Sequence, residues 1–186
     1  ASGPDDPVTF EHLGVRAEVL STLAGLGYEE PTPIQREAIP VLLTGRDVLG
    51  QAETGTGKTA AFALPMLHRI AEKPGPRGAT LGLVLVPTRE LAMQLAEAIH
   101  KYSKKTGARV VPVYGGASMD QQIRALRHGA EVVVATPGRA LDHLRRAPVG
   151  THRVPPPGTA PGARRAARRR RHVQPVRVDA RERRRA

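Results

Sequence analysis

Apolar positions along residues 10–146 follow a helical period in some segments and form continuous apolar runs in others. Between residues 15 and 26 they recur every three or four positions, which predicts a helix that stops at Gly27. A second helix is predicted over residues 33–43, because Thr32 is a favourable N-cap and Pro33 suits the first helical position. Further helices are predicted at residues 58–72, 88–105 and 119–127.

Strands are predicted between these helices. Residues 80–86 are apolar at consecutive positions, as expected of a strand covered on both faces in a parallel sheet. The other predicted strands, two of them with the turn that follows, are residues 47–51, 108–116 and 131–138. Strands that alternate with helices imply crossover connections, so the sequence predicts an α/β fold with a parallel sheet flanked by helices.

The length of the chain favours one domain, because 186 residues cannot supply two full α/β domains. The chain has no cysteine, so neither disulfides nor thiolate metal sites are expected, and a reducing compartment is the natural location. The first residues, ASGPDDP, are acidic and no long apolar run follows them. We therefore expect neither a signal peptide nor a membrane span. The protein is expected to be soluble and cytoplasmic.

The net charge of +12 is concentrated at one end of the chain. Residues 147–186 hold 12 arginines against Asp179 and Glu182, which gives +10, and they contain no Lys, Leu, Ile, Phe, Met or Tyr. Such a segment cannot bury enough apolar surface to offset the entropy of ordering. We predict that this Arg/Pro-rich tail is disordered, as are residues 1–9.

The segment AETGTGKT, residues 52–59, lies between a predicted strand and a predicted helix. In that position Gly55 and Gly57 allow unusual backbone angles, and the inward N–H groups and the helix N-terminus attract phosphate. Lys58 would reach the β and γ phosphates and the Thr59 hydroxyl would bind Mg²⁺. Ala52 stands where the general phosphate-loop pattern has Gly. The alternative is a tight turn with a solvated lysine.

Three more turns follow predicted strands, namely PTRELA at residues 87–92, the pair Gly115–Gly116, and TPGR at residues 136–139. They should therefore lie at the carboxyl edge of the sheet, where α/β proteins bind ligands. Upstream, GYEEPTPIQ occupies residues 27–35, and Phe10 stands 17 residues before Gly27. The amide of Gln35 could pair with the donor and acceptor edge of adenine.

In this order, these motifs resemble those of the first RecA-like domain of DEAD-box ATP-dependent RNA helicases, over residues 10–146. The resemblance implies ATP and Mg²⁺ as cofactors, and an adenine-recognition motif within residues 10–36. Core packing is the alternative for Phe10 and Tyr28. The nucleotide-binding residues that it implies are Phe10, Tyr28, Thr32, Pro33, Gln35, Ala52, Glu53, Thr54, Gly55, Thr56, Gly57, Lys58 and Thr59, with Lys58 and Thr59 also in the catalytic role and Thr59 reaching Mg²⁺ through ATP.

The same resemblance implies that the three turns hold the backbone of single-stranded RNA without reading its sequence. An ion pair within the helix is the alternative for Arg89, and an N-cap is the alternative for Thr136. The implied RNA-contacting residues are Pro87, Thr88, Arg89, Gly115, Gly116, Thr136, Pro137, Gly138 and Arg139. Protein partners are not indicated.

The family's activity, ATP hydrolysis coupled to RNA unwinding, also needs an Asp-Glu-Ala-Asp run and a second RecA-like domain, and neither occurs after Arg146. A genuine basic tail, a reading-frame shift near Arg146 and a truncation or fusion are the possible explanations, and we favour the frame shift. We expect an incomplete domain with uncovered strand edges and a tendency to aggregate. We also expect weak nucleotide binding and negligible hydrolysis.

Two other functions are possible from the sequence. A non-catalytic nucleic-acid-binding protein could act through the Arg-rich tail, since 12 arginines would neutralise several phosphates. Another phosphate-loop ATPase or kinase is disfavoured by the order of the three later turns.

Overall fold

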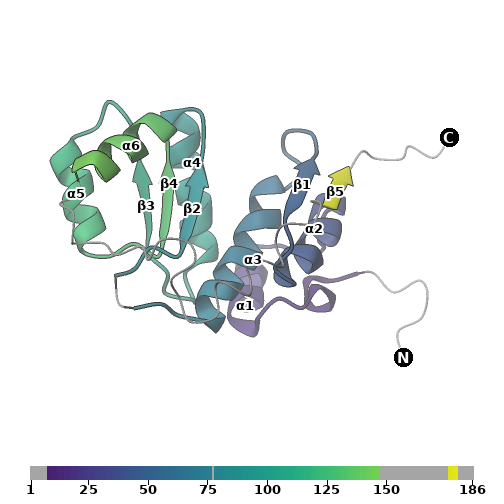
Figure 1. Ribbon diagram of the computed structural model, residues 1–186. Coiled ribbons are helices and arrows are strands. Elements are labelled where there is room, and N and C mark those ends of the chain that lie inside the picture. The colour runs from purple at the N-terminus through teal and green to yellow at the C-terminus, as the bar shows by residue number, and fades with distance from the viewer. Residues whose placement is uncertain (1–7, 77, 147–175, 180–186) are drawn as a thin grey trace, which may run out of the picture.

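The chain folds into alternating strands and helices in a computed structural model, which describes residues 8–76, 78–146 and 176–179 (Figure 1). The strands are β1 (Val48–Gln51), β2 (Gly82–Leu85), β3 (Val110–Val113), β4 (Val132–Ala135) and β5 (Val176–Asp179). The helices are the 3-10 helix η1 (Phe10–Leu13), α1 (Ala17–Gly25), α2 (Pro33–Leu43), α3 (Lys58–Glu72), α4 (Arg89–Tyr102), α5 (Met119–Arg127) and α6 (Pro137–Arg146). The α/β class predicted from the sequence is confirmed.

Local signals in the sequence predicted the ends of α2, α3 and α5, whereas α1 is shorter than the helix expected over residues 15–26. The expected bounds of α3 and α5 agree with the structure at both ends. Thr32 caps α2 with Pro33 as its first residue, as predicted. The helix expected over residues 88–105 is shorter, because Thr88 is its N-cap and accepts from Leu91 N at 3.2 Å. The 3-10 helix η1 was not predicted.

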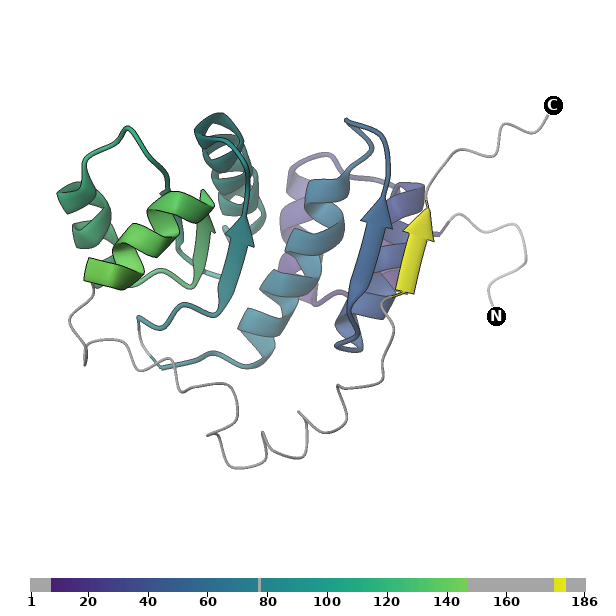
Figure 2. The same ribbon diagram turned by 45° about the horizontal axis from the view of Figure 1, so that its top comes forward.

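All strand pairs are parallel, but they form two sheets, β1–β5 and β2–β4–β3. The central strand β4 pairs with both neighbours, so that Val132 lies opposite Gly82 on β2 and Val110 on β3. All four β4 residues are buried. Helix α4 covers one face of this sheet, while α5 and α6 lie on the other (Figure 2). The main core joins α1, α3, α4 and the face of the sheet toward α4.

The expectation that residues 80–86 form a strand covered on both faces is wrong for one face. Val84 packs on the main core, but Leu83 is 59% exposed and Leu85 is 56% exposed. These leucines share a face with Val133 and Ala135, their partners in register. Side chains of α5 and α6 bury that face over β4 and β3 and stop short of β2. Strand β2, which stands at the end of this sheet, therefore carries an exposed apolar face.

The prediction of disorder is wrong at two places. Residues 176–179 form β5 beside β1, with Val176 opposite Val48, because a short stretch that contains alternating valines can extend a parallel edge. Thr9 is the N-cap of η1, and its backbone N–H donates to His12 Nδ1 at 3.1 Å. The rest of the predicted tail and residues 1–7 lie outside the described residues.

The strands of the two described sheets point in the same direction. The arrowheads of β1, β2, β3 and β4 lie on one side of the molecule (Figures 1 and 2). The loop before α3 and the start of α6 consequently lie on that side. None of the described helices is long and apolar enough to cross a membrane.

Candidate functional site

The loop between β1 and α3 has the backbone shape of an anion-binding turn. Gly55 and Gly57 have φ angles of 83° and 87°, which confirms that they adopt a conformation rare for other residues. At Gly57, the N-cap of α3, an added Cβ would lie 2.3 Å from Gln35 Nε2. Position 57 thus requires glycine both for its backbone angles and for the close approach of Gln35.

Lys58 points its ammonium group back into this loop. The Nζ atom donates to the carbonyl oxygens of Ala52 and, at 2.8 Å, of Glu53. The Thr56 hydroxyl donates to the same Glu53 carbonyl at 2.7 Å. The ammonium therefore lies against the backbone of the loop at the N-terminus of α3, where an anion would also be attracted. Phosphate oxygens fit this arrangement, because they can replace the two carbonyl oxygens as acceptors.

Gln35 of helix α2 and its N-cap residue Thr32 form hydrogen bonds with the backbone of the loop. Gln35 is 1% exposed; its Oε1 accepts from Thr32 N at 3.0 Å, and its Nε2 donates to Gly57 O at 3.1 Å. The Thr32 hydroxyl donates to Thr56 O at 2.8 Å. The resemblance found in the sequence predicts Thr32, Pro33 and Gln35 as adenine contacts. The structure brings Thr32 and Gln35 against the phosphate loop, with Pro33 between them as the first residue of α2, and contact of all three with adenine stays a prediction.

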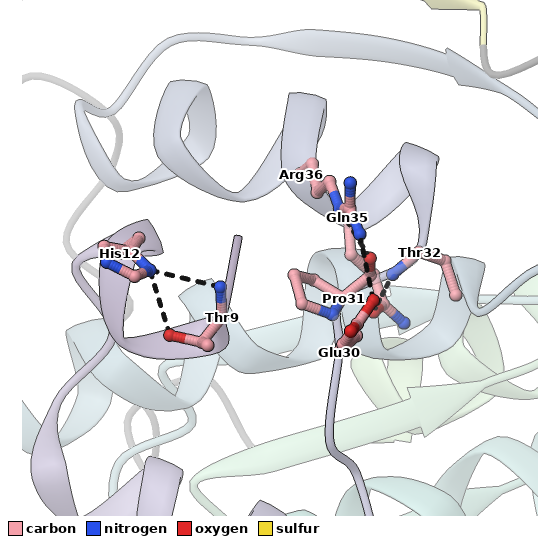
Figure 3. A network of polar contacts seen from close by, with 7 residues as sticks. All are labelled: Thr9, His12, Glu30, Pro31, Thr32, Gln35 and Arg36. Carbon is pink, nitrogen blue, oxygen red and sulfur yellow. Dashed lines mark hydrogen bonds and ion pairs between the residues drawn. The ribbon is translucent and has the colours of Figure 1, made fainter. Parts of the chain in front are cut away.

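The start of α2 is held by a residue that the sequence analysis missed (Figure 3). Arg36 Nε donates to Pro31 O at 2.8 Å, and Arg36 Nη2 lies 3.5 Å from a Glu30 carboxylate oxygen. Both contacts fix the segment that leads into Thr32. The sequence signal for this contact is an arginine directly after Gln35 and an acidic residue six positions before that arginine.

Phe10 and Tyr28 pack in the core. Their rings meet edge to face with centroids 6.3 Å apart, and Tyr28 meets Tyr102 in the same way at 5.9 Å. The Tyr28 and Tyr102 hydroxyls are 2.8 Å apart. Burial, and then this hydrogen bond, raise the pKa of Tyr102 above its usual range. These contacts match the core-packing alternative, and a role for either aromatic at adenine stays a prediction.

The three later turns gather at one edge of the β2–β4–β3 sheet, as expected. Thr88 and Arg89 follow β2, Gly115–Gly116 follows β3, and residues 136–139 follow β4 between them. An added Cβ on Gly116 would lie 3.5 Å from Arg89 Nη1, so this guanidinium reaches the glycine turn. Arg139 Nη1 donates to Ala117 O at 2.9 Å on the same turn. The site therefore presents two arginines beside a glycine turn.

Arg89 also makes the ion pair that was its alternative role. Its Nε lies 2.5 Å from the Glu90 carboxylate, and both side chains are exposed. The hydrogen bond from Arg89 lowers the pKa of Glu90. An exposed pair of this kind contributes little to stability and leaves the guanidinium free to exchange partners. Thr136 directly precedes Pro137, the first residue of α6.

The described residues contain no group of three or more His, Asp or Glu side chains placed to hold a metal ion. Near the phosphate loop, the partly exposed Thr59 in the first turn of α3 offers a hydroxyl oxygen. A hydroxyl oxygen is a ligand type that Mg²⁺ accepts alongside phosphate oxygens.

Comparison with known proteins gives concordant matches. The model of the DEAD/DEAH box helicase family matches residues 32–154. The ATP-dependent RNA helicase DeaD of Klebsiella pneumoniae is 58% identical over 139 residues, which cover 74% of this chain and 21% of that protein. DeaD of Escherichia coli (strain K12) is 56% identical over 140 residues, which cover 74% of this chain and 22% of that protein.

Two solved structures are also similar. The RNA-helicase Prp28 from Chaetomium thermophilum bound to ADP has a TM-score of 0.68 and 44% identity, over 79% of this chain and 36% of that one. A hypothetical ATP-dependent RNA helicase from Sulfolobus tokodaii has a TM-score of 0.61 and 37% identity, over 69% of this chain and 36% of that one. The chain spans about a fifth of the length of the curated relatives it matches.

Proposed function

This chain belongs to the DEAD/DEAH box helicase family, and on that premise we propose that it carries the ATP-binding and RNA-backbone-binding surface of an ATP-dependent RNA helicase. In the proposed role, ATP binding and hydrolysis are coupled to the separation of RNA strands. The observation that carries this proposal is that the four loops emerge on one side of the molecule, although their strands belong to two sheets. The phosphate loop after β1 and the turns after β2, β3 and β4 all emerge on one side of parallel strands.

At the proposed ATP site, each role follows from the chemistry of the loop. The Lys58 ammonium would exchange the carbonyls of Ala52 and Glu53 for phosphate oxygens, and the N–H groups at the start of α3 would add donors. Residues Thr54, Gly55 and Gly57 would line the triphosphate, and the Thr59 hydroxyl would help to hold Mg²⁺. When bound, Mg²⁺ would neutralise charge that develops on the transferring phosphoryl group.

At the proposed RNA site, hydroxyls, backbone N–H groups and guanidinium groups face the phosphates of one strand. Arg89 and Arg139 flank the Gly115–Gly116 turn, and Thr88 and Thr136 stand at the starts of α4 and α6. Groups of these types bind phosphate and sugar rather than base edges, so affinity should depend little on sequence.

The test of the ATP site is equilibrium binding of a fluorescent ATP analogue to the whole chain. Lys58→Ala is expected to weaken binding at least about tenfold, because it removes a charge-assisted contact to phosphate. Lys104→Ala, at an exposed position beyond the end of α4, is the matched control. We expect negligible ATP turnover by this chain, since the described residues hold no carboxylate cluster near Thr59. Turnover that Lys58→Ala abolishes would contradict that expectation.

A second candidate is nucleic-acid binding through residues 147–186, which the 12 arginines of this segment favour. Deleting these residues separates the two functions. Loss of all RNA affinity with unchanged nucleotide affinity would assign the RNA site to the arginine-rich segment rather than to the three turns. A cytoplasmic location stays a proposal from the sequence.

A further inference from the structure

Helix α5, which the structure describes in full, has one buried residue, and that residue is polar. Gln122 is 6% exposed, whereas the rest of the helix is partly or fully exposed. A buried amide costs stability unless its donors and acceptors are satisfied. The contacts of Gln122 therefore indicate which elements it joins.

Gln122 joins the end of β3 to the first two turns of α6. Its Nε2 donates to Tyr114 O at 2.9 Å, and Tyr114 directly precedes the Gly115–Gly116 turn. Its Oε1 lies 3.0 Å from His143 Nε2 and accepts from Arg139 Nη1 at 3.5 Å. Two segments of the proposed RNA site, the glycine turn after β3 and the start of α6, thus meet at one side chain.

The chemistry of the partners fixes the orientation of the amide. A backbone carbonyl can only accept, so the NH₂ group must face Tyr114; a guanidinium can only donate, so Oε1 must face Arg139. His143 Nε2 must then carry a hydrogen, so that it can donate to Gln122 Oε1. The network is satisfied in one arrangement, and this arrangement holds Arg139 Nη1 between Gln122 and Ala117 O.

We propose that Gln122 is a positioning residue that sets the spacing between the Gly115–Gly116 turn and Arg139, so that both contact the same RNA backbone. Arg139 has five N–H donors, and Nη1 is the nitrogen held by the protein. Within the described residues its Nη2 and Nε make no hydrogen bond, so they can meet phosphate at a fixed distance from the glycine turn. This inference rests on the proposed RNA site and adds a residue that makes no RNA contact itself.

The test measures the binding of a fluorescently labelled single-stranded oligouridylate to variants of the whole chain. Gln122→Met keeps the volume and removes both hydrogen-bonding functions, and Gln121→Met makes the same change at the exposed neighbouring position. We expect Gln122→Met to weaken RNA binding about tenfold, as loss of hydrogen bonds to a charged group would, and Gln121→Met to have no effect. Affinity for the ATP analogue should not change in either.

A double-mutant cycle with Arg139→Ala tests whether Gln122 acts through Arg139. Once Arg139 is alanine, adding Gln122→Met should cost little further affinity. Additive losses, or equal affinity of Gln122→Met and Gln121→Met, would overturn the positioning role. If Arg139→Ala alone leaves RNA affinity unchanged, the proposed RNA contact is itself wrong and the inference falls with it.

Gln122→Asn covers the case in which the Met variant does not fold. It keeps a polar amide but is one methylene shorter, so it cannot reach both Tyr114 and α6. We expect it to lose RNA affinity while nucleotide affinity stays close to wild type, which shows that the variant is folded. Wild-type RNA affinity in a folded Asn variant would overturn the proposal.

Discussion

The phosphate loop and the three later turns both stand at the carboxyl ends of parallel strands, but the strands that carry them differ. Strand β4 is buried along its whole length between β2 and β3. Strand β1, which leads into the phosphate loop, is exposed at three of its four residues, with Leu49 52% exposed. The three turns are arranged around a buried central strand, whereas the phosphate loop follows an exposed strand.

The difference shows that the two sites obtain their shape from different sources. The turns after β2, β3 and β4 are spaced by the sheet itself, with Gln122 as a cross-link. The phosphate loop is shaped mainly by side chains, since Thr32 and Gln35 bind its backbone from α2 and Lys58 binds it from α3. We therefore expect the first region to respond to changes in the sheet and the second to changes in α2.

The largest expected effect comes from placing a charge on each strand. Val134→Asp puts a carboxylate at a fully buried position of β4, and we expect a loss of ~4 kcal/mol or more in the free energy of unfolding, because the charge has no partner. Leu49→Asp on β1 should cost about 1 kcal/mol or less, because that side chain already faces solvent. Urea unfolding followed by circular dichroism measures both. Similar losses in the two variants would show that β1 is covered in solution.

A smaller effect is expected at Gln35. Gln35→Met fills the same space but removes the hydrogen bonds to Gly57 O and Thr32 N, which frees the phosphate loop to move. We expect affinity for an ATP analogue to fall about tenfold, as loss of two buried hydrogen bonds would allow, while RNA affinity is retained. Binding titrations with both ligands measure this. Together with Gln122→Met, the variant would separate the two regions, and an equal loss for both ligands would show that they are coupled.

Sequence reasoning located the phosphate loop and both ends of α3 because their signals are local. A strand, two glycines and a lysine within a few residues specify a turn and a helix start whatever packs around them. The clustering of Arg89, Gly116 and Arg139 was also predictable, since parallel strands end at a common edge.

Features that depend on distant packing were not predictable. Gln122 lies in a polar helix with Gln beside it, and only the position of Tyr114, Arg139 and His143 around it reveals that it is buried. The apolar run at residues 80–86 carries no sign that one face stays open, because that depends on where α5 and α6 end. Likewise, the two valines of Val176–Asp179 are too short a signal within an arginine-rich segment to predict a strand, and pairing with β1 supplies it.

The smallest expected effect is a dependence of stability on pH that distinguishes two histidines. Burial is the main cause that lowers the pKa of His68 below 6.5; Glu72 opposes it, and Arg16 and Arg69 add to it. Burial, and then Arg139 and Arg146, likewise lower the pKa of His143, against Asp142. Because the unfolded chain then binds more protons than the folded one, the free energy of unfolding should fall as pH drops from about 6.5 toward the folded-state pKa values.

The two histidines differ in what protonation does to them. His68 Nδ1 accepts from Arg16 N at 3.2 Å, so a proton on Nδ1 removes that hydrogen bond, whereas His143 already donates from Nε2 and keeps its bond when charged. We expect His68→Asn, which retains an acceptor oxygen and does not titrate, to keep stability at neutral pH and to flatten part of the acid-side decline. His143→Asn should flatten another part. Urea midpoints from pH 8 to about pH 5, above the range in which ordinary carboxyl groups titrate, test this. A decline that is unchanged in the double variant would mean that other groups titrate on unfolding.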